Sequence, residues 1–112
     1  MIYELREYVA VPGKREAVHR RFAEGTLALF EKHGLDVVGF WADEQDGDRI
    51  VYLMRFADEE TRRRKWAAFQ GDQDWKALKT ASEASGPIVA EMLSRTLASP
   101  VYWPHDTARE TP

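Results

Sequence analysis

The sequence predicts an α+β domain with the ferredoxin-like element order β-α-β-β-α-β. Three observations indicate it. Four segments rich in aromatic and β-branched residues are separated by two segments of helical periodicity, in that order. Asp46-Gly47 lies in the polar turn between the middle two strand segments, as in a hairpin. The strand segments are apolar on both faces, although two helices of one chain can cover only one face of a four-stranded sheet.

The N-terminal half contains a strand, a helix and a second strand. Residues 2–11 form the first strand, and Pro12-Gly13 ends it. Residues 14–33 show a helical pattern that ends at His33-Gly34, because glycine accepts the left-handed cap conformation. One helix face is apolar and the other is expected to face water: Val18, Phe22, Leu29 and Phe30 against Lys14, Arg20, Arg21, Glu24 and Lys32. Residues 36–42 form the second strand.

The C-terminal half repeats the pattern. Residues 49–56 form the third strand, and Asp58 is placed to cap the helix that follows. Gly71-Asp72 divides this helix, whose second piece runs to Ser85. Residues 88–97 form the fourth strand. We therefore expect one domain over residues 1–98, and a C-terminal arm with a flexible tail over residues 99–112.

The two apolar faces of the strands predict self-association. In the third strand, Ile50, Tyr52, Met54 and Phe56 are predicted to lie on one face of the sheet, and Val51 and Leu53 on the other. In the second strand, strict alternation predicts Val37 and Trp41 on one face, and Val38 and Phe40 on the other. An exposed apolar face of this size usually marks an interface. We expect a homodimer that packs sheet on sheet, with the segment 99–104, SPVYWP, lying across the partner or the rim of the assembly.

The composition limits the classes of function. The chain has 112 residues, of which 44% are hydrophobic and 31% charged, as in a soluble globular domain. The net charge of −3 argues against a nucleic-acid partner. No apolar run approaches the roughly 20 residues that span a bilayer, and the N-terminus does not have the pattern of a signal peptide. With no cysteine, thiolate chemistry is excluded and a reducing, cytoplasmic location is expected.

The stretch 60–78, ETRRRKWAAFQGDQDWKAL, sets a basic run beside a tryptophan. On a helix, Arg62, Trp66 and Phe69 share one stripe while the other cations spread around the circumference. The basic run is therefore interpreted as a solvated helix face rather than a nucleic-acid patch. Arg62 is the exception, because it lies on the packed stripe and is placed to reach an anionic group in a cavity.

Four segments resemble the NIPSNAP family in order and spacing over residues 1 to about 97. They are MIYELREYVAVPGK, LFEKHGLDVVGFW, VYLMRFAD and KWAAFQGDQDWKAL. The family is similar to the dimeric α/β barrel group, in which two facing four-stranded antiparallel sheets form the barrel. The resemblance thus implies a dimeric α/β barrel. Relatives in the wider group include cofactor-free oxygenases, isomerases and haem-degrading enzymes, with pockets between sheet and helices.

The candidate site is built from charged strand residues and from aromatic residues. Glu4, Arg6 and Tyr8 share one strand face, and the partners considered for Glu4, Glu7 or Glu91 are Arg55 and Arg95. The candidate catalytic residues are Arg6, Tyr8, His33 and Arg62. The candidate ligand-binding residues are Tyr8, Trp41, Tyr52, Trp66 and Trp75. Structural ion pairs, core aromatic residues and a helix-capping His33 are the alternatives.

The expected function is the binding of a small, partly apolar or aromatic metabolite between sheet and helices. A metal-free, cofactor-independent enzyme of the oxygenase or isomerase type would use such a pocket, and a non-catalytic ligand-binding or protein-interaction module is the alternative. The three histidines lack the spacing of a zinc site, and no Gly-rich phosphate loop is present. We therefore expect no metal and no cofactor.

Overall fold

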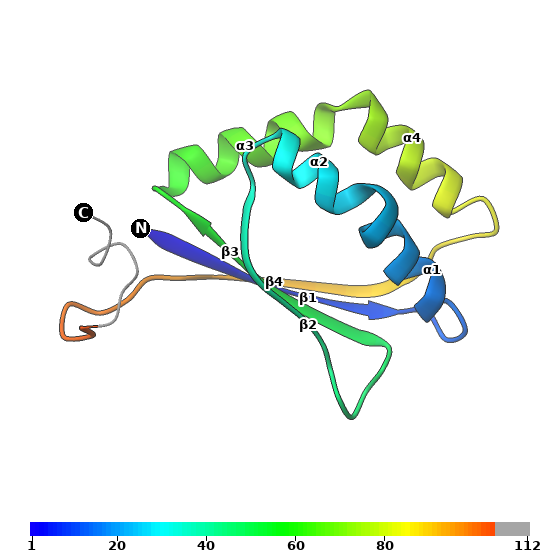
Figure 1. Ribbon diagram of the computed structural model, residues 1–112, viewed down its shortest axis with the longest axis horizontal. Helices are drawn as coiled ribbons and strands as arrows, with labels where there is room; N and C mark the ends of the chain where they lie inside the picture. The colour runs from blue at the N-terminus through cyan, green and yellow to red at the C-terminus, as the bar shows by residue number, and fades with distance from the viewer. Residues whose placement is uncertain (105–112) are drawn as a thin grey trace.

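The computed structural model describes residues 1–104 and forms an α+β domain with one four-stranded antiparallel sheet. The strands are β1 (Ile2–Ala10), β2 (Asp36–Ala42), β3 (Arg49–Phe56) and β4 (Val89–Leu97), in the spatial order β2-β3-β1-β4. All helices lie on one side of this sheet (Figure 1). The predicted fold class and element order are confirmed. The expected flexible tail and His105 lie outside the described residues, and the boundary at residue 98 stays a prediction.

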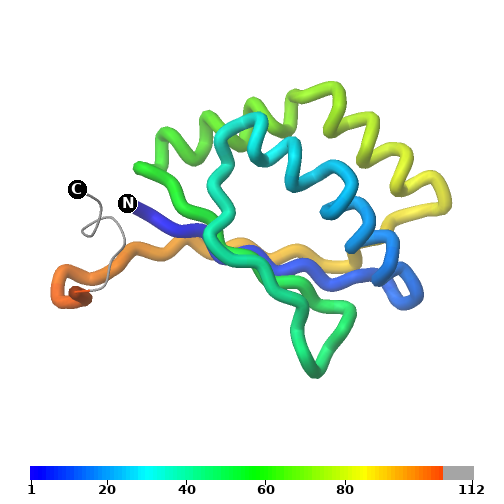
Figure 2. Tube along the Cα trace, in the orientation of Figure 1, coloured from blue at the N-terminus to red at the C-terminus, as the bar shows by residue number. Residues whose placement is uncertain are grey.

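The helical layer has two arms (Figure 2). The first is made of α1 (Arg15–Arg21), the π-helical segment η1 (Phe22–Thr26) and α2 (Leu27–Lys32). The second is made of α3 (Glu59–Gly71) and α4 (Gln73–Ser82). Asp58 caps α3 by accepting from the Thr61 amide, and Asp72 caps α4 by accepting from the Asp74 amide. No helix in residues 1–104 is long and apolar enough to cross a bilayer.

The core lies between the sheet and these helices. Strand register sets Glu4 opposite Met54, Arg6 opposite Tyr52 and Tyr8 opposite Ile50, so the even-numbered residues of β1 and β3 share the helix-covered face. The buried core combines these strand residues with residues of both helical arms: Val18, Phe22, Phe30, Leu35, Ile50, Tyr52, Met54, Phe56, Trp66, Phe69 and Ile88. The predicted packing of Trp66 and Phe69 is confirmed.

The prediction of strict alternation in β2 is wrong. The pairing of β2 with β3 shifts between Val37 and Gly39, so a β-bulge changes the side on which later residues lie. Val37 pairs with Met54 and Phe40 with Tyr52, which places both on the helix-covered face. Trp41 instead lies on the open face. Its ring covers Gly39, where a Cβ would clash with the ring.

The predicted exposure of Arg21 is also wrong, because its side chain is only 6% exposed. Arg21 ends α1, and the wider π-helical turn begins at the next residue. The Thr26 hydroxyl donates to the Arg21 carbonyl at 3.2 Å, which satisfies a backbone acceptor inside this turn. Gly25 allows α4 to approach, since a Cβ there would meet the Leu78 side chain at 2.5 Å.

Candidate functional site

A cavity of about 350 Å³ lies between the sheet and the two helical arms. Its lining is aromatic and cationic: Arg6, Tyr8, Arg21, Phe22, Thr26, Phe30, Trp66, Phe69, Gln70, Trp75, Lys76 and Lys79. A smaller cavity of about 240 Å³ shares Tyr8, Arg21, Trp75 and Lys79 with it and reaches β4. The four shared residues form a common wall between the two spaces.

Beside the cavity, the carboxylate of Glu4 is completely buried and accepts four hydrogen bonds. Oε2 accepts from Arg6 Nη1 at 2.7 Å and from the Ser94 hydroxyl at 2.6 Å. Oε1 accepts from Arg62 Nε at 2.9 Å and from Trp66 Nε1 at 2.8 Å. Burial alone would raise the pKa of Glu4, but these four donors outweigh it and lower the pKa to about 2. Glu4 is therefore a buried, ionised carboxylate at neutral pH.

Glu4 holds Arg6 beside the aromatic floor of the cavity. The Arg6 guanidinium lies 4.3 Å from the centre of the Trp66 ring. Its Nε donates to the Tyr52 hydroxyl at 2.9 Å, and its Nη2 donates to the Tyr8 hydroxyl at 3.1 Å. Burial, and then the neighbouring Tyr8, raise the pKa of Tyr52 well above its usual value, so Tyr52 stays neutral.

The π-helical turn shapes the opposite wall. It brings Phe22 and Thr26 to the cavity together with Arg21. The Arg21 guanidinium lies 5.3 Å from the centre of the Trp75 ring. One nitrogen, Nη1, contacts Ser82 Oγ at 3.2 Å and Glu83 Oε2 at 3.3 Å. π-Helical turns are frequent at functional sites because they place side chains that a regular helix would direct elsewhere.

The structure brings together only part of the predicted site. Tyr8, Trp66, Trp75 and Arg6 line the cavity. Tyr52 lies beneath it, fully buried, and contacts it only through the hydroxyl network. Trp41 lies on the other face of the sheet and is 54% exposed, so its placement in a cavity between sheet and helices is wrong. The bulge in β2 is the reason.

The two remaining candidates lie outside the cavity wall. Arg62 does reach a buried anion, but that anion is Glu4. His33 follows α2, and its Nε2 lies 2.7 Å from Oδ2 of Asp72, the residue that caps α4. Lys32 contacts the same oxygen at 2.7 Å. Hydrogen bonds from Lys32 and then His33 lower the pKa of Asp72, so this cluster ties the end of α2 to the start of α4.

The predicted ion-pair partners are wrong. Arg6 and Arg62 pair with Glu4, Arg49 pairs with Glu7 at 2.9 Å, and Arg55 pairs with Asp36 at 2.8 Å. Arg95 lies opposite Leu5 on the open face of the sheet. The prediction of strand partners for Glu4 fails for two reasons. β1 itself carries Arg6, two residues from Glu4, and the second cation, Arg62, comes from the helix α3.

Sequence reasoning missed several residues of the cavity. Arg21, Thr26, Gln70, Lys76 and Lys79 line it but were not candidates. Lys76 and Lys79 follow Trp75 at spacings of one and four in a segment that was expected to be helical. The i,i+4 relation of Trp75 and Lys79 is the one signal that places a cation beside the aromatic wall. The spacing of three residues between Val18 and Arg21 is the signal that would have placed Arg21 on the packed face, whereas nothing in the sequence marks the π-helical turn that follows it.

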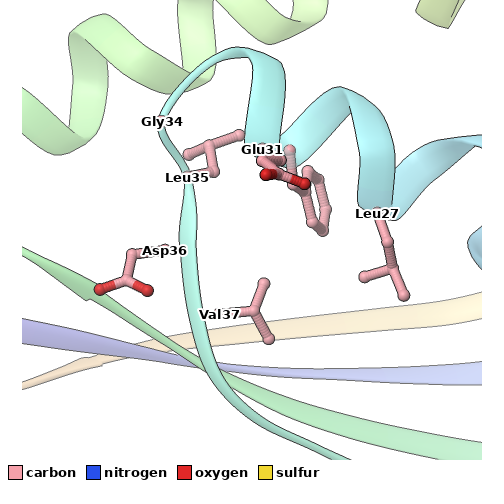
Figure 3. Close-up of a pocket in the computed structure, with 7 residues that line it drawn as sticks. Leu27, Glu31, Gly34, Leu35, Asp36 and Val37 are labelled. Atoms are coloured by element: carbon pink, nitrogen blue, oxygen red, sulfur yellow. The ribbon is translucent and has the colours of Figure 1, made fainter.

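A second hollow of about 420 Å³ opens at the outer edge of the sheet (Figure 3). Leu27 and Phe30 of α2 line one side, and Leu35 and Val37 line the other. It contains none of the hydrogen-bond network around Glu4. Within the described residues, no group of three or more His, Asp or Glu side chains is placed to hold a metal ion.

Comparisons with known proteins agree on the architecture. The NIPSNAP family model matches residues 3–103. A NIPSNAP family protein from Agrobacterium tumefaciens is similar with a TM-score of 0.80 and 17% identity, covering 94% of this chain and 98% of the other. An uncharacterized NIPSNAP-like domain protein from Burkholderia xenovorans has a TM-score of 0.77 and 20% identity, with coverages of 92% and 88%. An antibiotic biosynthesis monooxygenase has a TM-score of 0.60 and 14% identity, with coverages of 89% and 99%. No curated protein matches the chain.

Proposed function

The chain belongs to the NIPSNAP family, and on that premise we propose that it binds a small, partly apolar or aromatic metabolite between its sheet and its helices. The cavity with Tyr8, Trp66 and Trp75 in its lining is the observation that carries this proposal. Small-molecule sites are typically concave, mostly apolar and supplied with a few fixed polar groups. A volume of about 350 Å³ suits a molecule of one or two rings.

The polar groups of the cavity support recognition without a metal. Glu4, Arg6, Tyr52 and Tyr8 form one hydrogen-bonded chain from the core to the cavity, which fixes Arg6 and Tyr8 in place. A fixed polar group at a cavity favours a metal-free enzyme of the oxygenase or isomerase type over a filled interaction module. A non-catalytic binding protein remains the second candidate, because the same groups also suffice to orient a ligand. The absence of cysteine fits a cytoplasmic location.

We also propose that the chain is a homodimer whose open sheet faces pack together. Apolar residues gather on the face that carries no helices: Tyr3, Leu5, Trp41, Val51, Leu53, Leu93 and Leu97. Trp41, Leu93 and Leu97 are 54%, 50% and 41% exposed. A second copy offers the same apolar surface, which is how an isologous interface works.

The order of the strands suggests where the C-terminal arm would bind in this dimer. A two-fold axis parallel to the strands places β2 of one protomer opposite β4 of its partner. Asp36, Arg55, Tyr3 and Leu97 form one row across the sheet, so β2 begins at the end where β4 stops. The partner's arm, which carries an 81% exposed Tyr102, would then emerge beside the hollow of Figure 3. We propose that the arm occupies that hollow.

Calorimetric titration with 2-naphthamide and 2-naphthoate tests the binding proposal. We expect at least one of these two-ring probes to bind, and we expect Gln70→Trp to abolish that binding by filling the cavity mouth. Gln73→Trp is the matched control, because Gln73 begins α4 and does not line the cavity. If neither probe binds, or if Gln70→Trp leaves binding unchanged, the cavity is not the ligand site.

A further inference from the structure

The hydrogen atom of the Tyr8 hydroxyl is directed to the cavity by its neighbours. Tyr52 is fully buried, and its hydroxyl accepts from Arg6 Nε. The one acceptor that the structure gives the Tyr52 hydroxyl within residues 1–104 is the Tyr8 oxygen, at 3.2 Å. The Tyr8 oxygen therefore accepts twice, from Tyr52 and from Arg6 Nη2 at 3.1 Å. A phenolic oxygen that accepts twice has its own hydrogen left to donate, and no residue in the described part of the chain accepts it.

Arg21 has spare donors on the same wall. The side chain is 94% buried by its neighbours, being only 6% exposed, yet both of its side-chain hydrogen bonds use Nη1. No side chain among residues 1–104 accepts from Nε or Nη2. The structure also contains no fully enclosed side-chain nitrogen or oxygen without a partner in this part of the chain. These N–H groups therefore reach open space, and Arg21 lines the two cavities as well as a separate hollow of about 310 Å³ beside Glu24 and Leu78. The guanidinium lies over the Trp75 ring, which lines both cavities and not that hollow. A guanidinium with two free donor nitrogens, Nε and Nη2, matches a carboxylate.

Lys79 completes what we call the donor cluster, Tyr8, Arg21 and Lys79. All three residues line both cavities. Among residues 1–104 no carboxylate lies within ion-pair distance of Lys79 or of Lys76, which also lines the larger cavity. Glu83 lines the smaller cavity and contacts Arg21 at 3.3 Å, so it offsets one of these charges. The larger cavity has no Asp or Glu in its described lining.

The donor cluster adjoins an aromatic surface. Trp75 belongs to the same shared wall, and Phe22, Phe30, Trp66 and Phe69 continue the lining of the larger cavity. A ring that lies on this surface gains from burial and from edge-to-face contacts. Donors without acceptors at one end require a ligand group that only accepts, and an ionised carboxylate is such a group.

We propose that the donor cluster binds the carboxylate of a small aromatic acid whose ring lies on the aromatic lining of the larger cavity. This inference rests on the proposed function, because it assigns a chemical class to the ligand of the same cavity. Tyr8 donates one hydrogen bond, Arg21 donates through Nε and Nη2, and Lys79 supplies charge at the exposed rim. We give Arg6 a positioning role, because its hydrogen bonds to Glu4, Tyr52 and Tyr8 hold it in place, although Nη1 and Nη2 each keep one further N–H.

The test compares two probes that share a ring system and differ in charge. At pH 7, 2-naphthoate is an anion and 2-naphthamide is neutral. We expect the native protein to bind 2-naphthoate about tenfold more tightly or better, because hydrogen bonds to a charged group are the stronger kind. We expect Lys79→Gln to remove a large part of this preference by weakening 2-naphthoate alone. Lys79 is exposed, so the variant retains the fold, which circular dichroism checks.

Lys14→Gln is the matched control, because Lys14 precedes α1 and does not line either cavity. The preference for 2-naphthoate should also fall as salt is raised, since part of it is charge attraction at an exposed rim. Equal affinity for the two probes, or a preference that Lys79→Gln and Lys14→Gln leave equally intact, would overturn the donor cluster while leaving the proposed cavity function in place. If neither probe binds, the proposed function itself fails.

Discussion

Replacing Glu4 with glutamine tests the network that supports the cavity. Gln keeps the shape of Glu4 but turns one carboxylate oxygen into an NH₂ group. Each oxygen now accepts two donors: Arg6 and Ser94 at one, Arg62 and Trp66 at the other. The amide must therefore aim its own donors at two existing donors, and it removes the counter-charge of an Arg6 side chain that is 12% exposed. Breaking a buried pair in this way costs about 3–5 kcal/mol.

The pH dependence of this effect has a definite sign. The pKa of Glu4 is lowered from 4.5 to about 2 in the folded protein. A group with a depressed folded pKa contributes stability above its unfolded pKa and loses it as the pH falls through the folded value. Glu4 should thus stabilise the native protein by about 3 kcal/mol near pH 7. This contribution should fade between pH 4.5 and pH 2, which spans the two values.

Urea unfolding of native protein and Glu4→Gln, followed at pH 7 and again near pH 3, measures both quantities. We expect a loss of about 3–5 kcal/mol at pH 7 and a smaller difference at pH 3. Glu59→Gln is the control, because Glu59 also pairs with Arg62 but is 49% exposed, and should cost about 1 kcal/mol or less. A Glu4→Gln protein within 1 kcal/mol of native at pH 7, about the cost of a surface pair, or a difference that does not depend on pH, would refute this account of the network.

Three further changes probe the core, the assembly and the helix junction. Trp66→Ala should lower the free energy of unfolding by about 3–5 kcal/mol, because Trp66 is 9% exposed, and near-native urea unfolding would contradict its core role. In analytical ultracentrifugation the native protein should have a mass of twice 12.9 kDa. The Trp41→Asp variant should have a mass of 12.9 kDa, because a dimer interface would bury its unpaired charge. A native protein that is monomeric at tens of micromolar would contradict the dimer. Asp72→Ala should lower the melting temperature more than Asp74→Ala, because only Asp72 caps α4 and contacts His33; equal shifts would contradict that role.

Local chemistry accounts for the parts of the fold that the sequence predicted. Gly13 and Gly34 have φ values of 84° and 70°, so the two turns flanking the first helical arm need glycine, and sequence reasoning finds such positions. The division at Gly71-Asp72 was predictable for a similar reason, because the Asp72 side chain accepts from the Asp74 amide.

Features that depend on one backbone irregularity were not predictable. A single extra residue in β2 moved Trp41 from the expected cavity to the open face, since one residue reverses the side of every later side chain. The π-helical turn after Arg21 is a second irregularity that the sequence does not mark. The partners of Glu4 lie at sequence separations of 2, 58, 62 and 90, so three of the four contacts arise only when the chain folds.

The role of Glu4 links the stability of the fold to the chemistry of the cavity. Because Glu4 takes Arg6 Nη1, the remaining nitrogens of Arg6 turn to the two tyrosines, and Tyr52 then gives its hydrogen to Tyr8. The direction of the Tyr8 hydrogen follows from that sequence of donations. A protein without the Glu4 charge would free Arg6 to bind an incoming carboxylate directly, and Tyr8 would lose its fixed role as donor. In the binding mode proposed above, the buried carboxylate of Glu4 thus holds Arg6 in place, and the Tyr8 hydroxyl and the Nε and Nη2 atoms of Arg21 are the groups assigned to the ligand.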